Sequence, residues 1–174
     1  SIDNYASMRE NEEDARIEVE RVAEKRFAAR ISKKRAEQKF RKGRASKLAI
    51  IVKVKDDGSK KRRLIVDLKR SRGNDKAVVP ERVVLPRLGD AVMMMLAMLR
   101  MLVANGFTGE QNPQEQRSME LISADFSDAY FHFRVHESEW EHCLSPDIIP
   151  DSWLLWVDLC FGLAAAPVIW WRCA

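Results

Sequence analysis

The sequence predicts an α+β fold. Three features predict it: two β-rich runs around an Asp-Gly turn, a long apolar helical stretch, and a final region in which strands and helices alternate. The chain has 174 residues, of which 46% are hydrophobic, so it is long enough to bury a core of its own. Global disorder is therefore not expected.

The first element is a charged segment. Residues 8–42 contain neither proline nor glycine, and their apolar residues recur near helical spacing, so we expect one long helix with a thin apolar stripe. Its first half is acidic and its second half basic, an order that suits the helix dipole. Two interpretations stay open, a solvated helix or linker and a nucleic-acid-binding arm.

The second element is a hairpin. Two β-rich runs, residues 48–55 and 63–68, flank the turn sequence Asp56-Asp57-Gly58-Ser59. Its tip and flanks carry more cations than solubility requires, namely Lys53, Lys55, Lys60, Lys61, Arg62 and Arg63. An anion-binding fingertip is one interpretation of this pattern.

The remaining elements follow from apolar periodicity. Residues 87–104 predict a buried helix whose methionines fill the core, and the polar residues 105–118 predict a loop. We then expect a strand over 121–126, a helix over 137–142, a strand over 153–159 and a helix that begins near 164.

Charge and apolar runs limit the function classes only weakly. The formal net charge of +4 would favour a polyanion without requiring one. The apolar runs at residues 91–103 and 153–171 are too short or carry charge and proline, so we expect no membrane span.

The cysteines predict a reducing, intracellular setting, cytoplasmic or nuclear. Cys143, Cys160 and Cys173 are odd in number and form no C-x-x-C pair. The spacing of His136, His142 and Cys143 matches no zinc pattern, so we expect ordinary histidines and buried thiols.

Asp125 is a candidate metal ligand. It ends an apolar run, where a carboxylate is costly unless it meets a cation or hydrogen-bond donors, and Asp128 follows three residues later. From spacing alone a structural interpretation stays open, with Asp128 capping the following turn and Asp125 pairing with an arginine.

Three motifs carry a resemblance to a known family. Ser123-Ala124-Asp125-Phe126-Ser127-Asp128-Ala129-Tyr130-Phe131 resembles the first palm motif of reverse transcriptases, D-x-x-D-A-Y/F-F. The segment from Lys61 to Leu68, followed by Asn74, is similar to the family's basic fingers hairpin and R-x-x-V-D-x-R. The segment from Phe161 to Pro167 resembles the F-G-L-x-x-A-P motif of long-terminal-repeat retrotransposon polymerases. The motifs follow the family's order.

The resemblance covers roughly Leu48 to Ala174 and implies polymerase fingers and partial palm over residues 47–174, after a charged helical segment over residues 1–46. Lys69 stands where the fingers pattern ends in arginine, and Trp170-Trp171 replaces a frequent phenylalanine. The sequence holds no Y-x-D-D, which the family carries further downstream. We therefore expect a truncated polymerase that is inactive by itself.

The resemblance implies template-directed transfer of deoxynucleotides onto a primer, along an RNA or DNA template, with Mg²⁺ or Mn²⁺ as cofactor. Asp125 would be catalytic and would hold both ions of a two-metal mechanism, helped by the backbone carbonyl of Phe126. The other carboxylates would come from Y-x-D-D. The remainder of a polymerase polyprotein is the expected partner.

The resemblance also implies a nucleotide site. Arg63 would clamp the triphosphate, assisted by Lys53 or Lys55, between which the uncertain hairpin register does not decide. The other implied contacts are backbone amides of Asp128 and Ala129 for the phosphates, Tyr130 beneath the sugar, and Phe161 and Gly162 lining the site.

Two other functions stay open. One is a catalytically inactive relic, or a domesticated fragment that keeps the fold and binds nucleic acid. The other is an interaction protein that works through residues 8–42, with the rest of the chain as a scaffold.

Overall fold

The computed structural model describes residues 3–40, 45–79, 88–106 and 126–173. They belong to two compact units. The larger unit comprises Ser1–Arg82 together with Ser127–Ala174, and the smaller unit comprises Val83–Phe126.

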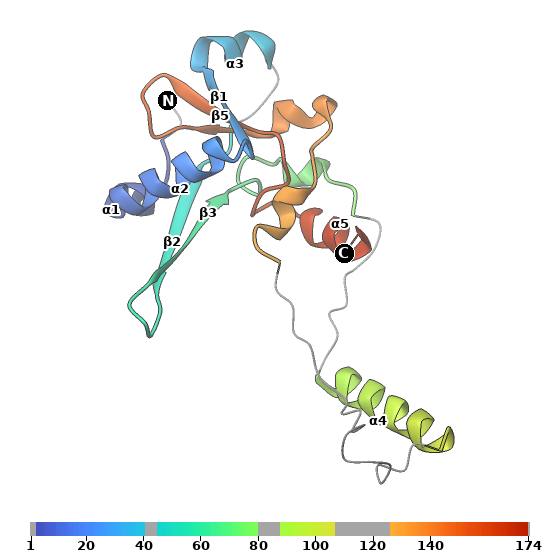
Figure 1. Cartoon of the computed structure of the whole chain (residues 1–174). Coiled ribbons are helices and arrows are strands. Elements are labelled where there is room, and N and C mark those ends of the chain that lie inside the picture. The colour runs from blue at the N-terminus through green and yellow to red at the C-terminus, as the bar shows by residue number, and fades with distance from the viewer. Residues whose placement is uncertain (1–2, 41–44, 80–87, 107–125, 174) are drawn as a thin grey trace. The chain divides into compact units, whose positions relative to one another are not determined.

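The larger unit holds two antiparallel sheets with helices beside them (Figure 1). One sheet has the strand order β1-β5-β4, formed by Ala28–Ser32, Ser152–Trp156 and Leu144–Pro146. The other is the hairpin of β2 (Leu48–Val54) and β3 (Lys60–Val66). This mixture of helices and antiparallel strands confirms the α+β class.

The prediction of a single helix over residues 8–42 is wrong. The segment forms α1 (Ala6–Glu10), α2 (Glu12–Glu24), β1 and α3 (Lys33–Lys39). The chain turns at Arg26, which has a φ of 61°, and all five residues of β1 then pair with β5. A helix with a thin apolar stripe buries little surface, so strand pairing against the core stabilises this segment better.

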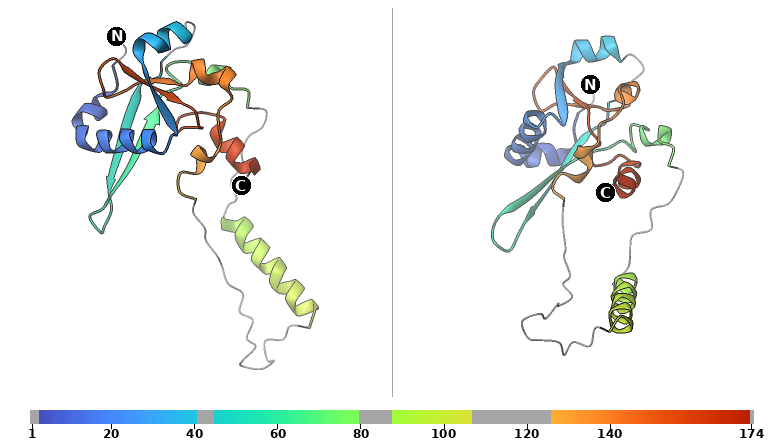
Figure 2. Two further views of the ribbon diagram at one scale, coloured as in Figure 1. Left: turned by 45° about the horizontal axis from the view of Figure 1, so that its top comes forward. Right: turned by 45° about the vertical axis from the view of Figure 1, so that its right-hand side comes forward.

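The larger unit does not divide at residue 46, the predicted domain boundary. The backbone N–H of Tyr5 donates to the carbonyl of Leu48, and α2 crosses the hairpin (Figure 2). Val19 and Val22 of α2 are fully buried in the same core as Leu48. Each valine contributes about 1.5–3 kcal/mol by leaving water. The assignment of residues 1–46 to a charged N-terminal segment and of residues 47–174 to polymerase fingers and partial palm stays a prediction.

The hairpin is confirmed, and its register is now defined. Lys53 lies opposite Lys61, and Ile51 lies opposite Arg63. The turn closes at Gly58, whose φ of 78° suits a residue without a side chain.

The C-terminal part of the larger unit follows the predicted alternation with shifted bounds. The predicted helix over 137–142 is a 3-10 helix, η3 (Glu137–His142), and the predicted strand over 153–159 is β5. The last helix, α5, spans Ala166–Cys173. Two further 3-10 helices are η1 (Asn74–Lys76) and η2 (Ala129–His132). The predicted strand over 121–126 lies outside the described residues except for Phe126, and the predicted loop over 105–118 except for its first two residues.

The smaller unit holds α4 (Leu88–Ala104), which confirms the predicted helix. Its methionines do not form a core, since Met93, Met94 and Met101 are exposed by 64%, 65% and 66%. A helix buries its apolar face only against a second element, and the described part of this unit contains no other helix or strand. Among the helices that the structure describes, none is both long and apolar enough to cross a membrane.

Candidate functional site

Segments that are far apart in the sequence meet where β3 ends. The backbone N–H of Val66 donates to the carbonyl oxygen of Phe161 at 2.9 Å. The side-chain amide of Asn74 donates to the carbonyl of Gly162 and accepts from the N–H of Ala164, both at 2.9 Å. Asn74 therefore links the segment after the hairpin to the segment before α5.

An aromatic cluster brings η2 to the same place. The ring of Tyr130 meets that of Phe161 edge-on, with 5.3 Å between centroids. Phe131 also meets Phe161 edge-on, at 6.0 Å, and stacks on Phe27 at 4.4 Å. Phe131 is buried, while Tyr130 is half-buried. The buried ring anchors η2, and the half-buried ring keeps contact with solvent.

The hairpin presents its cations on two opposite faces, because side chains alternate along a strand. On one face Lys60 and Arg62 bind the carboxylate of Asp14 in α2, at 2.8 and 2.7 Å. These hydrogen bonds lower the pKa of Asp14. The cations on this face of the hairpin are therefore paired with α2.

The other face is exposed and cationic. It carries Lys53, Lys61 and Arg63, with Lys55 just beyond the end of β2. None of these four side chains forms an ion pair with another described residue. The register places Lys53 on the strand opposite Lys61 and diagonal to Arg63, whereas Lys55 belongs to the turn. Of these two lysines, Lys53 is thus the one that the register places beside Arg63.

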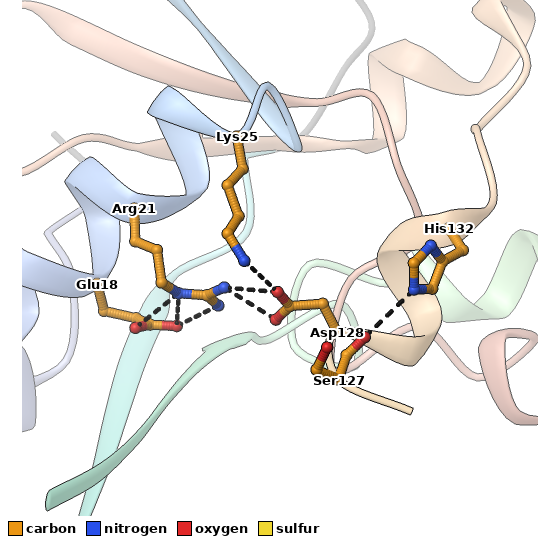
Figure 3. A network of polar contacts seen from close by, with 6 residues as sticks. All are labelled: Glu18, Arg21, Lys25, Ser127, Asp128 and His132. Carbon is orange, nitrogen blue, oxygen red and sulfur yellow. Dashed lines mark hydrogen bonds and ion pairs between the residues drawn. The ribbon is translucent and has the colours of Figure 1, made fainter. Parts of the chain in front are cut away.

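Asp128 is held by α2 (Figure 3). The Nη1 of Arg21 donates to both carboxylate oxygens of Asp128, at 2.8 and 2.9 Å, and the Nζ of Lys25 donates at 2.7 Å. Arg21 is itself bound to the buried carboxylate of Glu18 at 2.6 Å. Burial opposes the ionisation of Asp128, but the hydrogen bonds from Lys25 and Arg21 outweigh it and lower its pKa.

The backbone at Asp128 is also unusual. Its φ of 57° and ψ of 30° are left-handed, a region that aspartate tolerates better than most residues. Its carbonyl accepts from the N–H of Phe131 at 2.8 Å, so it opens η2. Asp128 thus stands at the start of the turn, as one interpretation of the sequence had it. Only its backbone carbonyl bonds to the turn, however, because its side chain makes no capping hydrogen bond.

Asp67, next to Val66, has a structural role. Its carboxylate accepts hydrogen bonds from the hydroxyl of Tyr5 and, at 2.9 Å, from the N–H of Arg70. These hydrogen bonds lower the pKa of Asp67. Asp67 therefore fixes the end of β3 to the N-terminal segment.

The predicted site residues are only partly brought together. Residues of the turn and of the Phe161 segment meet as one cluster, comprising Ala129, Tyr130, Phe161 and Gly162, with Asp128 at its edge. Arg63 lies three residues before Val66 on β3, about 10 Å along the strand. Asp125 lies outside the described residues, and Phe126 belongs to the smaller unit.

No metal site is defined by the described residues. They contain no group of three or more histidine, cysteine, aspartate or glutamate side chains that could hold an ion. Since Asp125 is not among them, metal binding by Asp125 and the carbonyl of Phe126 stays a prediction.

Sequence reasoning missed the residues of α2 that touch the site. Arg21 and Lys25 are four residues apart and so share one helix face, which is the signal that could have paired them. Their partner, Asp128, lies more than a hundred residues away in the sequence. Asp14 was likewise assigned only to an acidic stretch.

Comparison with known proteins adds no identity, because no family model, curated protein or solved structure matches the chain.

Proposed function

We propose that this chain is the fingers and the first part of the palm of a retroelement RNA-directed DNA polymerase. The observation that carries the proposal is the junction where β3 ends. The three segments that resemble family motifs are far apart in the sequence, yet Val66, Asn74, Tyr130, Phe161 and Gly162 link them directly.

The unpaired face of the hairpin supports a triphosphate site. Arg63 offers a planar fork that matches phosphate oxygens and stays charged at any working pH. Lys53 adds a second charge on the same face. Lys60 and Arg62 already share the carboxylate of Asp14, so the cations on the open face are those with no carboxylate partner among the described residues.

The turn supports the sugar and phosphate contacts. The half-buried ring of Tyr130 would lie beneath the sugar, where it would leave no room for a ribose 2′-hydroxyl. The backbone amides of Asp128 and Ala129 would meet the phosphates. Phe161, edge-on to Tyr130, would line the site together with Gly162.

The reaction would be transfer of a deoxynucleotide to a primer on an RNA or DNA template. Asp125 and the carbonyl of Phe126 would hold Mg²⁺ or Mn²⁺, which supplies charge neutralisation at the attacking and leaving oxygens. The remaining carboxylates and the grip on the duplex would come from the rest of a polymerase polyprotein.

The test compares two neighbouring arginines that point to opposite faces of β3. Calorimetric titration of the chain with a deoxynucleoside triphosphate and Mg²⁺ should show binding that Arg63→Ala weakens roughly 10- to 150-fold, as expected for one charge-assisted contact. Arg62→Ala is the matched control, because Arg62 is occupied by Asp14, and it should change the affinity little. Equal losses in the two variants, or no binding by the unaltered chain, would overturn the proposed site.

A further inference from the structure

Helix α2 lies outside the part of the sequence that resembles a polymerase, yet it contacts both elements that carry the proposed nucleotide site, the hairpin and the turn at Asp128. Near its first turn, Asp14 binds Lys60 and Arg62 of the hairpin. Near its last turn, Arg21 and Lys25 bind Asp128. These two contact points are separated by about 10–16 Å along the helix axis.

Neighbouring residues hold Arg21 in place where it contacts Asp128. Arg21 is fixed on one side by Glu18, whose side chain is 8% exposed, and on the other by Asp128, whose side chain is 18% exposed. The helix itself cannot rotate freely, because Val19 and Val22 are fully buried in the core. The position of α2 therefore fixes the position of Asp128.

The turn at Asp128 needs such support. Its backbone is left-handed, a conformation that persists where the surroundings enforce it. The next two residues are Ala129 and Tyr130, and the dihedral angles of Asp128 set the direction in which the amide and the ring point. Releasing the carboxylate would let the turn relax and would move the ring of Tyr130.

From this geometry we infer that α2 is a strut of the nucleotide site, with Arg21 and Lys25 as positioning residues that hold the turn through Asp128 while Asp14 holds the hairpin. This inference rests on the proposed function for its consequence, which is selection of the sugar. The strut holds Tyr130 against the place of the 2′-hydroxyl, so its loss should weaken discrimination against ribonucleotides more than it weakens deoxynucleotide binding.

The experiment measures the affinity of the whole chain for dATP and for ATP, each with Mg²⁺, and compares their ratio among variants. The double variant Arg21→Gln/Lys25→Gln should lower the discrimination severalfold. Arg16→Gln is the matched control, because Arg16 lies on the same helix and forms only an exposed pair with Glu13. Arg21→Lys, with Lys25 unchanged, should keep more of the discrimination than the double variant, since lysine keeps a charge beside Asp128 but cannot also hold Glu18 as the guanidinium does.

A second readout needs no nucleotide and separates this inference from the proposed function. The backbone amide resonances of residues 128–131 should shift in the double variant and stay in place in Arg16→Gln. If these resonances do not move in a folded double variant, α2 does not position the turn, and this conclusion holds whether or not the chain binds a nucleotide. If they move while the unaltered chain binds neither nucleotide, the strut stands as a structural element and its role in sugar selection fails with the proposed function.

A thermal melt of each variant completes the comparison. A purely structural role predicts a lower unfolding temperature with an unchanged ratio of ATP to dATP affinity, and that result would overturn the positioning role. Where the double variant does not fold, Asp128→Asn removes the same ion pairs with nearly the same shape, and the same outcomes apply to it.

Discussion

A β-carbon on Gly162 would overlap the carbonyl oxygen of Val66, because the two backbones are in direct contact where the Phe161 segment crosses the end of β3. Gly162 also has a φ of 115°, which L side chains rarely adopt. The glycine of the F-G-L motif is thus required by the junction itself.

Gly162→Ala should therefore destabilise the larger unit by about 2–3 kcal/mol or more, from backbone strain together with the clash. Denaturant unfolding gives the measurement. Gly58→Ala is the control, since Gly58 has a φ of 78° and open space around it, and it should cost only about 1–2 kcal/mol. Equal losses in the two variants would contradict the close approach of the two backbones.

Asp14→Asn should loosen the hairpin from α2 in a pH-dependent way. The pKa of Asp14 lies below its ordinary value of 3.8, so its stabilising contribution is present above that pH and is lost as the pH falls through the lower, folded-state value. Urea unfolding of the variant and of the unaltered chain should differ near neutral pH, and the difference should shrink as the pH falls below 3.8. A difference that persists in acid would argue against the ion pairs.

The three cysteines should react at very different rates. Burial raises the pKa of the Cys143 thiol to about 11 and raises that of Cys160 as well, whereas Cys173 is exposed. A thiol reagent at neutral pH should therefore modify one cysteine quickly and the other two only after unfolding. Cys173→Ser should remove the fast phase, and a fast phase that remains would place a second thiol at the surface.

The chain by itself should not extend a primer. The proposed two-metal chemistry needs carboxylates in addition to Asp125, and the sequence contains no Y-x-D-D to supply them. Primer extension with Mg²⁺ or Mn²⁺ is the measurement, with Asp125→Asn as the control. Incorporation by the unaltered chain above that of the control would show that the assigned mechanism is wrong.

Tyr130→Val should reduce discrimination against ATP relative to dATP, because a smaller side chain leaves room for the 2′-hydroxyl. The contact with Phe161 predicts some loss of stability as well. If Tyr130 were only a packing residue, the variant would lose about 3 kcal/mol or more in unfolding free energy and keep the same ratio of affinities. Calorimetric titration and thermal unfolding together distinguish these results.

The structure was predictable from the sequence wherever contacts between neighbouring residues decide it. The hairpin follows from β-rich runs on either side of Asp57-Gly58, and its turn is closed by contacts within a few residues. Helix α4 follows in the same way from its apolar run. The motif residues Asn74, Tyr130 and Phe161 were identified by their order in the sequence alone.

The sequence-based predictions failed where contacts with residues distant in the sequence determine the local structure. The charge pattern of residues 8–42 favours a helix, but pairing with β5 converts Ala28–Ser32 into a strand. The sequence also left Lys53 and Lys55 equivalent, because residues two apart share one face of a strand. Only the strand pairing, which ends at Val54, shows that Lys53 is in the ladder and Lys55 in the turn.

The sequence by itself therefore determined the local elements and the residue types of the candidate site: the hairpin, α4, the cations and the aromatic rings. Only the tertiary structure decided which face of the hairpin is paired with Asp14 and which is open. It also decided that Arg21 and Lys25 hold Asp128. The physical reason is that turn and helix preferences act over a few neighbouring residues. Ion pairs and strand pairing depend instead on which distant segments the buried core brings together.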